Sequence, residues 1–326
     1  MRAANEGVAL RINLKGFRFL GSGSAFPVKT VTNQVLASYS PIDPDWTKRT
    51  LGVEERKYLG NNESLSQLVL SASRKAILSS GQLVVPDLVI VATSTPDYIN
   101  PSMACILHGA LELPEETPAF DIQAVCNGFL YATSVAASLL SSSGKATALV
   151  VGADQFSRIT DFNSRNSIYF GDGAAAAVLA RDSEWQSDMV FDMYADGTDW
   201  KHFHTKSIES KFEMQASGVA KIVNSKVPKA ILKLLNDCGL SVEDVDYFVT
   251  HQPSKGVLDN LVSQLGISDS KLKRNYATNG NTAGATVPSI LALIHSNITS
   301  NSLVCYVSFG SGWTWTVGLI GRMKRN

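Results

Sequence analysis

The sequence predicts an α/β fold built from two similar halves. Two observations support this prediction: short runs rich in β-branched residues alternate with longer helical patterns, and several of these runs recur at a nearly constant spacing. The chain has 326 residues, which allows two domains at roughly 100–200 residues each. We expect residues 1–182 to form the first half and residues 183–326 to form the second.

Short apolar runs that end in small or turn-forming residues are the expected strands, because buried strands of α/β sheets have this pattern. These runs cover residues 87–93, 119–122, 148–152, 175–180, 245–250 and 303–308. Longer periodic patterns predict helices over residues 64–80, 128–141, 220–238 and 256–265. Pro228 lies inside the third helical pattern, so that helix is expected either to begin near Val227 or to bend there.

An internal repeat is the evidence for two halves. Three pairs of segments match: residues 91–93 with 249–251, Gly152 with Gly310, and the turn of Cys126 with the turn of Asn281. The first two pairs lie 158 positions apart (249 − 91 and 310 − 152), and the third lies 155 apart (281 − 126). Three matches at nearly one offset favour a duplicated layout.

Composition and charge exclude several classes of protein. Basic and acidic residues each number 29, so the formal net charge is zero, without the cationic excess of general nucleic-acid binders. No apolar run approaches the roughly 18 residues needed to span a membrane. The first 20 residues carry Glu6, Arg11, Lys15 and Arg18, which interrupt any signal-peptide core. We therefore expect a cytoplasmic protein with no membrane or nucleic-acid partner.

Cys126 is the first candidate for chemistry. It follows an expected strand and precedes a helix that begins Asn127-Gly128-Phe129. Unpaired N–H groups at a helix N-terminus favour a thiolate and lower the pKa from the free value of about 8.5, which would make a nucleophile. The alternative is a small buried hydrophobe. That alternative is our interpretation of the other cysteines, Cys105, Cys238 and Cys305, which form no C-x-x-C pair and are expected to be reduced.

His251 and Asn281 are the second and third candidates. His251 ends a strand pattern, where an imidazole is placed for proton transfer or for hydrogen bonding to a substrate carbonyl. Asn281 lies in a glycine-rich run whose amide could stabilise a developing oxyanion. The alternatives are a structural histidine and ordinary turn chemistry. The run 308–313 either offers an N–H group to an oxyanion or simply turns the chain, and no histidine group has zinc spacing.

Taken together, these motifs resemble the β-ketoacyl-acyl carrier protein (ACP) synthase III family of condensing enzymes. The resemblance extends from about Gly16 to Arg322. Its motifs are Trp46 with Arg49-Thr50 and Glu55-Arg56, VATSTPDYINPS at 91–102, FDIQAVCNGF around Cys126, YFGDGAAAAVL at 169–179, HQPS at His251, GNTAGATVP around Asn281, and SFGSGWTW at 308–315. The resemblance implies the thiolase fold, with two halves whose mixed five-stranded sheets are layered α-β-α-β-α.

The same resemblance implies the chemistry. It makes Cys126 the acyl acceptor, assigns the malonyl thioester to His251 and Asn281, and forms an oxyanion hole from the backbone N–H groups of Cys126 and Ser311. Thiolases proper have a further cysteine where this chain has SFGSG, which favours decarboxylative condensation. Coenzyme A (CoA) or ACP thioesters are then substrates, and neither a cofactor nor a metal is expected.

Contacts with substrates and partners also follow from the resemblance. Trp46 and Arg165 are expected to enclose the CoA adenine, since an aromatic face and a planar guanidinium suit that role. Lys221 and Lys255 are expected to dock the ACP, and Asn100 is expected to gate the acyl pocket across a homodimer. The partners implied are acyl-CoA or acyl-ACP, malonyl-ACP and the carrier protein itself.

The sequence departs from the family pattern in four places. Ser254 replaces a usual asparagine, Ser311 a usual glycine, Gly256 a docking arginine that is often present, and Asn100 a bulky apolar residue. The change at Asn100 predicts an unusual primer, either larger or more polar than in relatives. The leading hypothesis is a condensing enzyme that initiates fatty-acid or specialised-metabolite synthesis. Two alternatives stay open: an acyltransferase to an oxygen or nitrogen nucleophile without decarboxylation, and a catalytically silent partner subunit.

Overall fold

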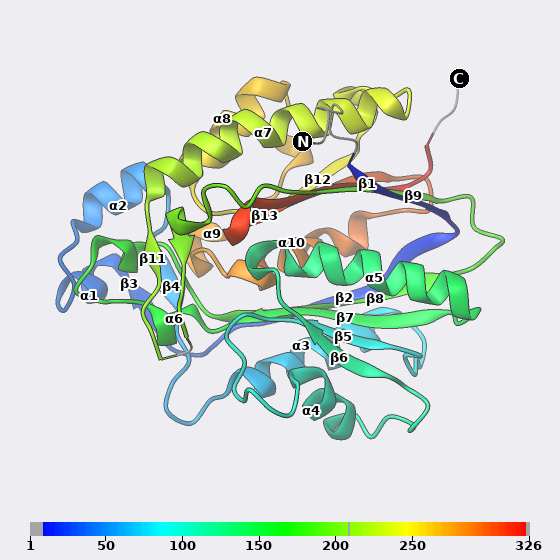
Figure 1. The fold of residues 1–326 in the computed structure, drawn as a ribbon, viewed down its shortest axis with the longest axis horizontal. Coiled ribbons are helices and arrows are strands. Elements are labelled where there is room, and N and C mark those ends of the chain that lie inside the picture. Colours follow the sequence, from blue (N-terminus) through cyan, green and yellow to red (C-terminus); the bar gives the residue numbers. More distant parts are fainter. Residues whose placement is uncertain (1–8, 208, 324–326) are drawn as a thin grey trace, which may run out of the picture.

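The computed structural model describes residues 9–207 and 209–323, and its helices and strands form five layers (Figure 1). Two five-stranded sheets lie on either side of a central helical layer, and a further helical layer covers the outer face of each sheet. This arrangement confirms the predicted α/β class and the α-β-α-β-α layering. Residues 1–8 of the expected first half and 324–326 of the second lie outside the described residues.

Both sheets are mixed. The first has the order β2-β8-β7-β5-β6 and the second the order β1-β9-β14-β13-β12. The first sheet contains β2 (Phe17–Ala25), β8 (Gly173–Arg181), β7 (Thr147–Asp154), β5 (Val89–Ala92) and β6 (Ala119–Ile122). The second contains β1 (Leu10–Lys15), β9 (Asp188–Ala195), β14 (Thr314–Gly321), β13 (Leu303–Gly310) and β12 (Tyr247–Thr250). The parallel pairs are β7 with β5, β5 with β6, and β13 with β12.

The helices divide among three layers. The central layer contains α5 (Gly128–Ser143) and α10 (Thr286–Ile294) (Figure 1). The outer face of the first sheet is covered by α3 (Leu65–Ser79) and α4 (Met103–Ala110). The outer face of the second sheet is covered by α7 (Ala216–Asp237) and α8 (Lys255–Leu265). Small side chains explain the position of α5: Ala132, Ala136 and Ala137 are fully buried, so the helix backbone approaches the sheets closely. The central layer is therefore the core that both halves share.

All six expected strands and all four expected helices are present. The alternative in which the third helix begins near Val227 is wrong, because α7 begins at Ala216 and continues through Pro228. Val223 and Val227 on this helix are buried in the apolar cluster that also contains Ile231. Tertiary packing on both sides of the proline offsets the lost backbone hydrogen bond.

One strand crosses between the halves. The sheet that otherwise comes from residues 188–321 takes β1 as its edge strand, paired antiparallel with β9 from Leu10 opposite Met193 to Lys15 opposite Asp188. The expected boundary at 182 and 183 falls between β8 and β9, and it stays a prediction. Residues 10–15 nevertheless belong structurally to the second sheet.

Two short turns meet at the centre of the molecule. These are the 3₁₀ turns η1 (Val125–Asn127) and η6 (Ala283–Ala285), each of which leads directly into a central helix. Both begin with a non-glycine residue in the left-handed region, at φ 48° for Val125 and φ 47° for Ala283. These two residues lie 158 positions apart (283 − 125), so the structural counterpart of Cys126 is Gly284. The predicted match of Cys126 with Asn281 is therefore three residues out of register.

Glycines make this meeting possible. A Cβ atom on Gly152 would lie 2.1 Å from the carbonyl oxygen of Gly284, and one on Gly310 would lie 3.1 Å from the nitrogen of Cys126. The end of each central strand thus approaches the turn of the opposite half too closely for a side chain.

We predict that Gly152→Ala destabilises the protein. The new methyl group would collide with a backbone carbonyl, and overpacking of this kind typically costs about 2 kcal/mol or more, which lowers Tm by several degrees. Thermal unfolding followed by circular dichroism measures the effect. Gly109→Ala in α4 is the matched control, since a Cβ there meets nothing within 4 Å and alanine favours a helix. Equal Tm values for the two variants would contradict the prediction.

Candidate active site

Cys126 lies in η1 at the start of α5 and is 3% exposed. Its carbonyl oxygen accepts a hydrogen bond from the buried hydroxyl of Ser308 on β13, at 2.7 Å. Its nitrogen faces Gly310 at the end of the same strand. Residues of the second half of the chain therefore fix the backbone of Cys126, which belongs to the first half.

His251 follows β12 directly and is 2% exposed. Its backbone N–H donates to the carbonyl of Val307 at 2.7 Å, which extends the parallel pairing of β12 with β13. The imidazole packs edge to face against Phe309, with ring centroids 5.0 Å apart and an interplanar angle of 81°. Its Nδ1 has no hydrogen-bond partner among the described residues.

Asn281 lies between α9 (Tyr276–Asn279) and η6, and it is 4% exposed. Its backbone N–H donates to Tyr169 at 2.8 Å, and its carbonyl accepts from Gly171 at 3.0 Å. The side-chain oxygen accepts from the N–H of Ala283 at 2.9 Å. Because that oxygen is occupied, the amide nitrogen is the part of the side chain left to donate to a ligand.

Packing links the surroundings of the three residues. Cys126 and Ala283 belong to one apolar cluster with Phe170, whose backbone forms a β-bridge with Asn281. The adjacent residues Phe309 and Gly310 contact His251 and Cys126 respectively. The structure thus brings the neighbourhoods of Cys126, His251 and Asn281 to one region, and their chemical roles stay predictions.

Asp154 is a central residue that the sequence analysis did not single out. It ends β7, is fully buried, and accepts hydrogen bonds at 2.8–3.0 Å from the Ser94 backbone and hydroxyl and the Thr95 hydroxyl. Its other oxygen accepts from the N–H of Gly284 at 2.9 Å, across the boundary between the halves. An aspartate at the end of a strand that is otherwise almost entirely apolar is the signal that could have identified it.

Burial reverses the expected ionisation of Cys126. Loss of solvent raises the pKa of the thiol well above its ordinary value, and the nearby carboxylate of Asp154 adds to the rise. The sequence-based expectation of a lowered pKa is therefore wrong for this structure, because desolvation outweighs the N-terminal end of α5. The cysteine holds its proton at neutral pH.

Burial also fixes the charge of His251. Desolvation lowers the pKa of the imidazole from its ordinary 6.5 to about 3. The ring is therefore neutral at physiological pH, with one nitrogen able to donate and one able to accept a proton.

Trp46 and Arg165 line a common cavity of about 770 Å³. Trp46 belongs to α2 (Pro44–Leu51) and is 44% exposed, while Arg165 begins the short turn η2 (Arg165–Ile168). The buried guanidinium of Arg56 donates to the carbonyl of Ile168 at 2.9 Å, and it also donates to Asn33 on the neighbouring segment. Arg56 therefore positions the turn that carries Arg165.

The remaining predicted residues lie around these elements. Ser311 directly follows Gly310, donates its hydroxyl hydrogen bond to the carbonyl of Phe203, and lines a second cavity of about 540 Å³ beside Val125. Lys221 is exposed on α7, and Lys255 is exposed at the start of α8, where it pairs with Asp259. Asn100 is exposed in the loop before α4.

The described residues contain neither a cluster of metal-ligating side chains nor a helix that could span a membrane. Across 9–207 and 209–323, no group of three or more His, Cys, Asp or Glu side chains could hold a metal ion. Within the same ranges, no helix is long and apolar enough to cross a membrane.

Comparison with known proteins identifies the family. Residues 120–197 match 3-oxoacyl-[acyl-carrier-protein (ACP)] synthase III, and residues 235–321 match its C-terminal domain. A β-ketoacyl-[acyl-carrier-protein] synthase III from Thiobacillus denitrificans is 34% identical over 315 residues, covering 93% of this chain and 98% of the relative. One from Rickettsia massiliae is 32% identical, covering 91% and 97%. The chain belongs to the β-ketoacyl-ACP synthase III family.

Solved structures agree with this assignment. The synthase III from Aquifex aeolicus is 28% identical in sequence and superposes with a TM-score of 0.86. The match covers 94% of this chain and 100% of the Aquifex chain. The chain therefore has the thiolase fold of this family, and it is an acyl-transferring condensing enzyme, as the sequence motifs predicted.

We predict that His251 makes the protein less stable in acid. Between pH 6.5 and about 3 the unfolded state binds a proton at this imidazole and the native state does not, so the free energy of unfolding falls as pH falls through this window. The His251→Gln variant lacks this imidazole. Its free energy of unfolding should therefore fall less steeply between pH 6.5 and 4.5 than that of the wild type, by about 1.4 kcal/mol per pH unit at most. Urea unfolding at several pH values measures both slopes. Identical slopes for the two proteins would show that the native imidazole titrates normally.

Proposed function

We propose that the protein loads an acyl group from acyl-CoA or acyl-ACP onto Cys126 and condenses it with malonyl-ACP to give a β-ketoacyl-ACP. The placement of Cys126 carries this proposal. The thiol lies at the start of α5, against the glycine that ends β13, and His251 and Asn281 enter the same region on neighbouring segments. The product would initiate fatty-acid or specialised-metabolite synthesis.

The first step is transfer of the acyl group. The Cys126 sulfur attacks the thioester carbonyl, its proton leaves, and the carbon–sulfur bond to CoA breaks as CoA departs as a thiol. Because burial keeps the resting thiol protonated, the proton must leave as the sulfur attacks, and the departing CoA takes up one proton, so the step balances. The backbone N–H groups of Cys126 and Ser311 are the proposed donors to the tetrahedral oxyanion.

The second step is decarboxylation and carbon–carbon bond formation. Malonyl-ACP loses carbon dioxide, and the electrons of the broken bond form an enolate whose oxygen accepts hydrogen bonds from His251 and Asn281. The enolate carbon then attacks the acyl carbonyl, and the bond to the Cys126 sulfur breaks to release a thiolate, which takes up a proton from solvent to restore the resting thiol. The free amide nitrogen of Asn281 supports this role, since its oxygen is already held by Ala283.

The cavity between α2 and η2 is the proposed entry for CoA. Its volume of about 770 Å³ is within the range of ligand pockets, and Trp46 and Arg165 both line it. Adenine would lie between the indole and the guanidinium. Lys255 supports a docking role for α8, because it lies against Gly52 at the end of the helix that carries Trp46.

The two alternative functions are not favoured. A silent partner subunit would not need the thiol, the imidazole and the carboxamide together, and the family relatives are named as synthases. Homodimer assembly and a cytoplasmic location are part of our proposal. The edge of the first sheet at β6 supports assembly, since within residues 9–207 and 209–323 this strand pairs on one side only and its other side could pair with a second copy.

We predict that Cys126 forms an acyl adduct that malonyl-ACP then consumes. Intact and peptide mass spectrometry after incubation with an acyl-CoA panel should locate the adduct on Cys126, and malonyl-ACP should release carbon dioxide and β-ketoacyl-ACP. Asn281→Ala should keep acylation and slow condensation by roughly 10²–10³, because only the enolate loses a donor. Cys126→Ala should form no adduct. An acyl-enzyme that transfers its acyl group without carbon dioxide release would replace our proposal with plain acyl transfer.

We predict that Trp46→Ala and Arg165→Ala raise KM for acyl-CoA with little change in kcat. Each variant removes one face of the proposed adenine site and leaves the cysteine untouched, so uniform binding is lost. Steady-state kinetics should show a KM increase of about five- to twentyfold. Arg74→Ala on the exposed face of α3 is the control. A fall in kcat with unchanged KM would assign these residues elsewhere in the mechanism.

A further inference from the structure

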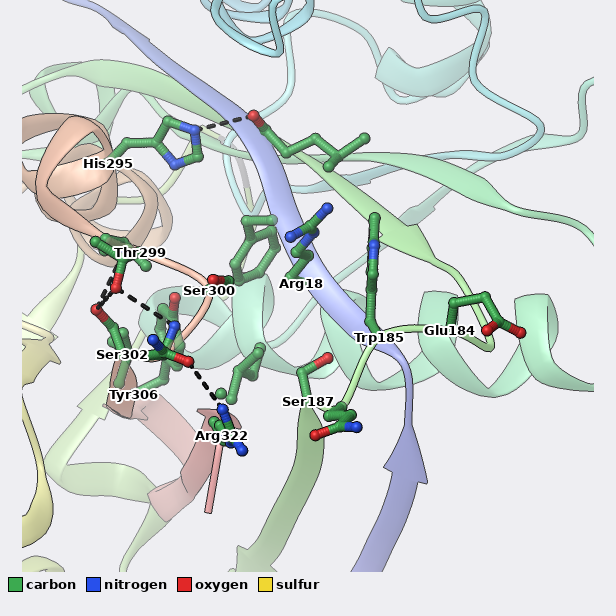
Figure 2. Close-up of a pocket in the computed structure, with 18 residues that line it drawn as sticks. Arg18, Glu184, Trp185, Ser187, His295, Thr299, Ser300, Ser302, Tyr306 and Arg322 are labelled. Atoms are coloured by element: carbon green, nitrogen blue, oxygen red, sulfur yellow. Dashed lines mark hydrogen bonds between the residues drawn. The ribbon is translucent and has the colours of Figure 1, made fainter. Parts of the chain in front are cut away.

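A third cavity lies at the opposite end of the sheets from Cys126 (Figure 2). Its volume is about 430 Å³, and its walls come from β2, the start of β13, the end of β14, the loop 184–187 and the segment 298–302. From Tyr306, the lining residue of β13 nearest to Gly310, the strand extends about 13 Å to Gly310 beside Cys126, at roughly 3.3 Å per residue. The cavity is therefore separate from the proposed condensation chemistry.

Aromatic side chains form two of its walls. Phe19 and Tyr306 pack edge to face, with ring centroids 5.6 Å apart. On the other wall the guanidinium of Arg18 lies over the ring of Trp185, at 3.5 Å from the ring centroid, and Figure 2 shows these two side chains adjacent. Aromatic rings and a stacked guanidinium offer flat surfaces, which suit a flat apolar body.

The cavity is cationic. Arg18 and Arg322 line it, and neither forms an ion pair with any described residue. Arg322 donates only to the neutral side-chain oxygen of Asn301, at 3.2 Å, and the Nε atom of Arg18 is buried without a partner. The acidic lining residue, Glu184, is exposed and lies away from both arginines in Figure 2. Two arginines against the one carboxylate of Glu184 give the lining a net positive charge, which favours an anionic ligand. Arg322 also borders a neighbouring cavity, which is lined by Glu243, Asp244 and Asp246.

Buried hydroxyls add hydrogen-bonding capacity. The hydroxyl of Ser187, a residue 8% exposed, is buried without a hydrogen-bond partner among the described residues, and Tyr306, 2% exposed, lines the same cavity. Burial raises the pKa of Tyr306, so its hydroxyl keeps its proton. Buried polar groups are normally paired, and the Ser187 hydroxyl lies where a ligand or an ordered water would pair it.

The rim is held in place before any ligand binds. The Ser302 hydroxyl accepts from the Thr299 N–H at 3.0 Å, and the N–H of Ser302 donates back to the carbonyl of Thr299. His295 contacts the carbonyl of Leu20 at 3.0 Å, which ties this segment to β2 (Figure 2). A fixed rim lowers the entropy lost on binding.

We propose that this cavity binds a small organic anion, which pairs its carboxylate or phosphate with Arg18 beside Trp185 and packs a flat apolar body against the aromatic walls, while Arg322 on the opposite side adds positive charge. The site lies on both halves of the chain, since β2 belongs to the first sheet and β13 and β14 to the second. Its ligand therefore bridges the two sheets.

Isothermal titration calorimetry of the full chain tests this proposal with benzoate, phenyl phosphate and the uncharged benzyl alcohol as probes. At least one anionic probe should bind, and binding should weaken about tenfold or more in Arg18→Gln, which removes a charge-assisted hydrogen bond. The loss should be smaller in Arg322→Gln, which removes only a nearby positive charge. Arg74→Gln on α3 is the matched control and should bind as the wild type does. Benzyl alcohol should bind much more weakly than either anion.

Three results would overturn the site. The first is that neither anion binds at about 10 mM. The second is that the wild type and Arg18→Gln bind the anionic probe with equal affinity. The third is that only Arg165→Gln loses binding, which would place the probe in the cavity of Trp46. Thermal unfolding of each variant confirms that it is folded. Because Arg322 is exposed, Arg322→Gln is expected to fold, and it tests the site if Arg18→Gln is unstable. A preference for benzoate over phenyl phosphate, or the reverse, identifies the anionic group.

Discussion

The close approach of η1 and η6 is the constraint on which the rest of the structure depends. Each turn packs against the central strand of the opposite half, and glycines at 152, 284 and 310 allow the backbones to come within contact. Asp154 accepts a hydrogen bond from Gly284, and Ser308 donates one to Cys126, so each half fastens the turn of the other. A thiol at this junction is fixed by both sheets at once.

The same junction explains the electrostatics of the site. Two sheets and two central helices exclude water, so the buried thiol keeps its proton and the buried imidazole stays neutral. A neutral pair avoids the cost of two buried charges in the resting enzyme. In the proposed reaction, charge would develop only when a thioester enters, and the backbone N–H groups of Cys126 and Ser311 are the proposed donors; preorganised donors stabilise a transition state without reorganisation.

The cavities divide the molecule functionally. The cavity beside Val125 borders η1, and the cavity of Trp46 and Arg165 reaches Tyr169, whose carbonyl accepts from the N–H of Asn281. These are the two cavities that we propose for the acyl thioester. The cavity of Arg18 and Arg322 lies at the far end of the central strands. Because β13 joins the far cavity to Gly310, a ligand there would act on the same strand that holds the thiol, although it would touch no reacting group.

The sequence alone determined the α/β class, the repeat and the three chemical candidates, because strand patterns, glycine-rich turns and motif order are local properties. It placed each expected strand within a few residues of its observed limits. Three results needed tertiary structure. Packing of Val223 and Val227 carries α7 through Pro228; the φ angles of Val125 and Ala283 set the true register of the repeat; and burial beside Asp154 reverses the ionisation expected for Cys126. Each depends on contacts between distant segments, which no local pattern records.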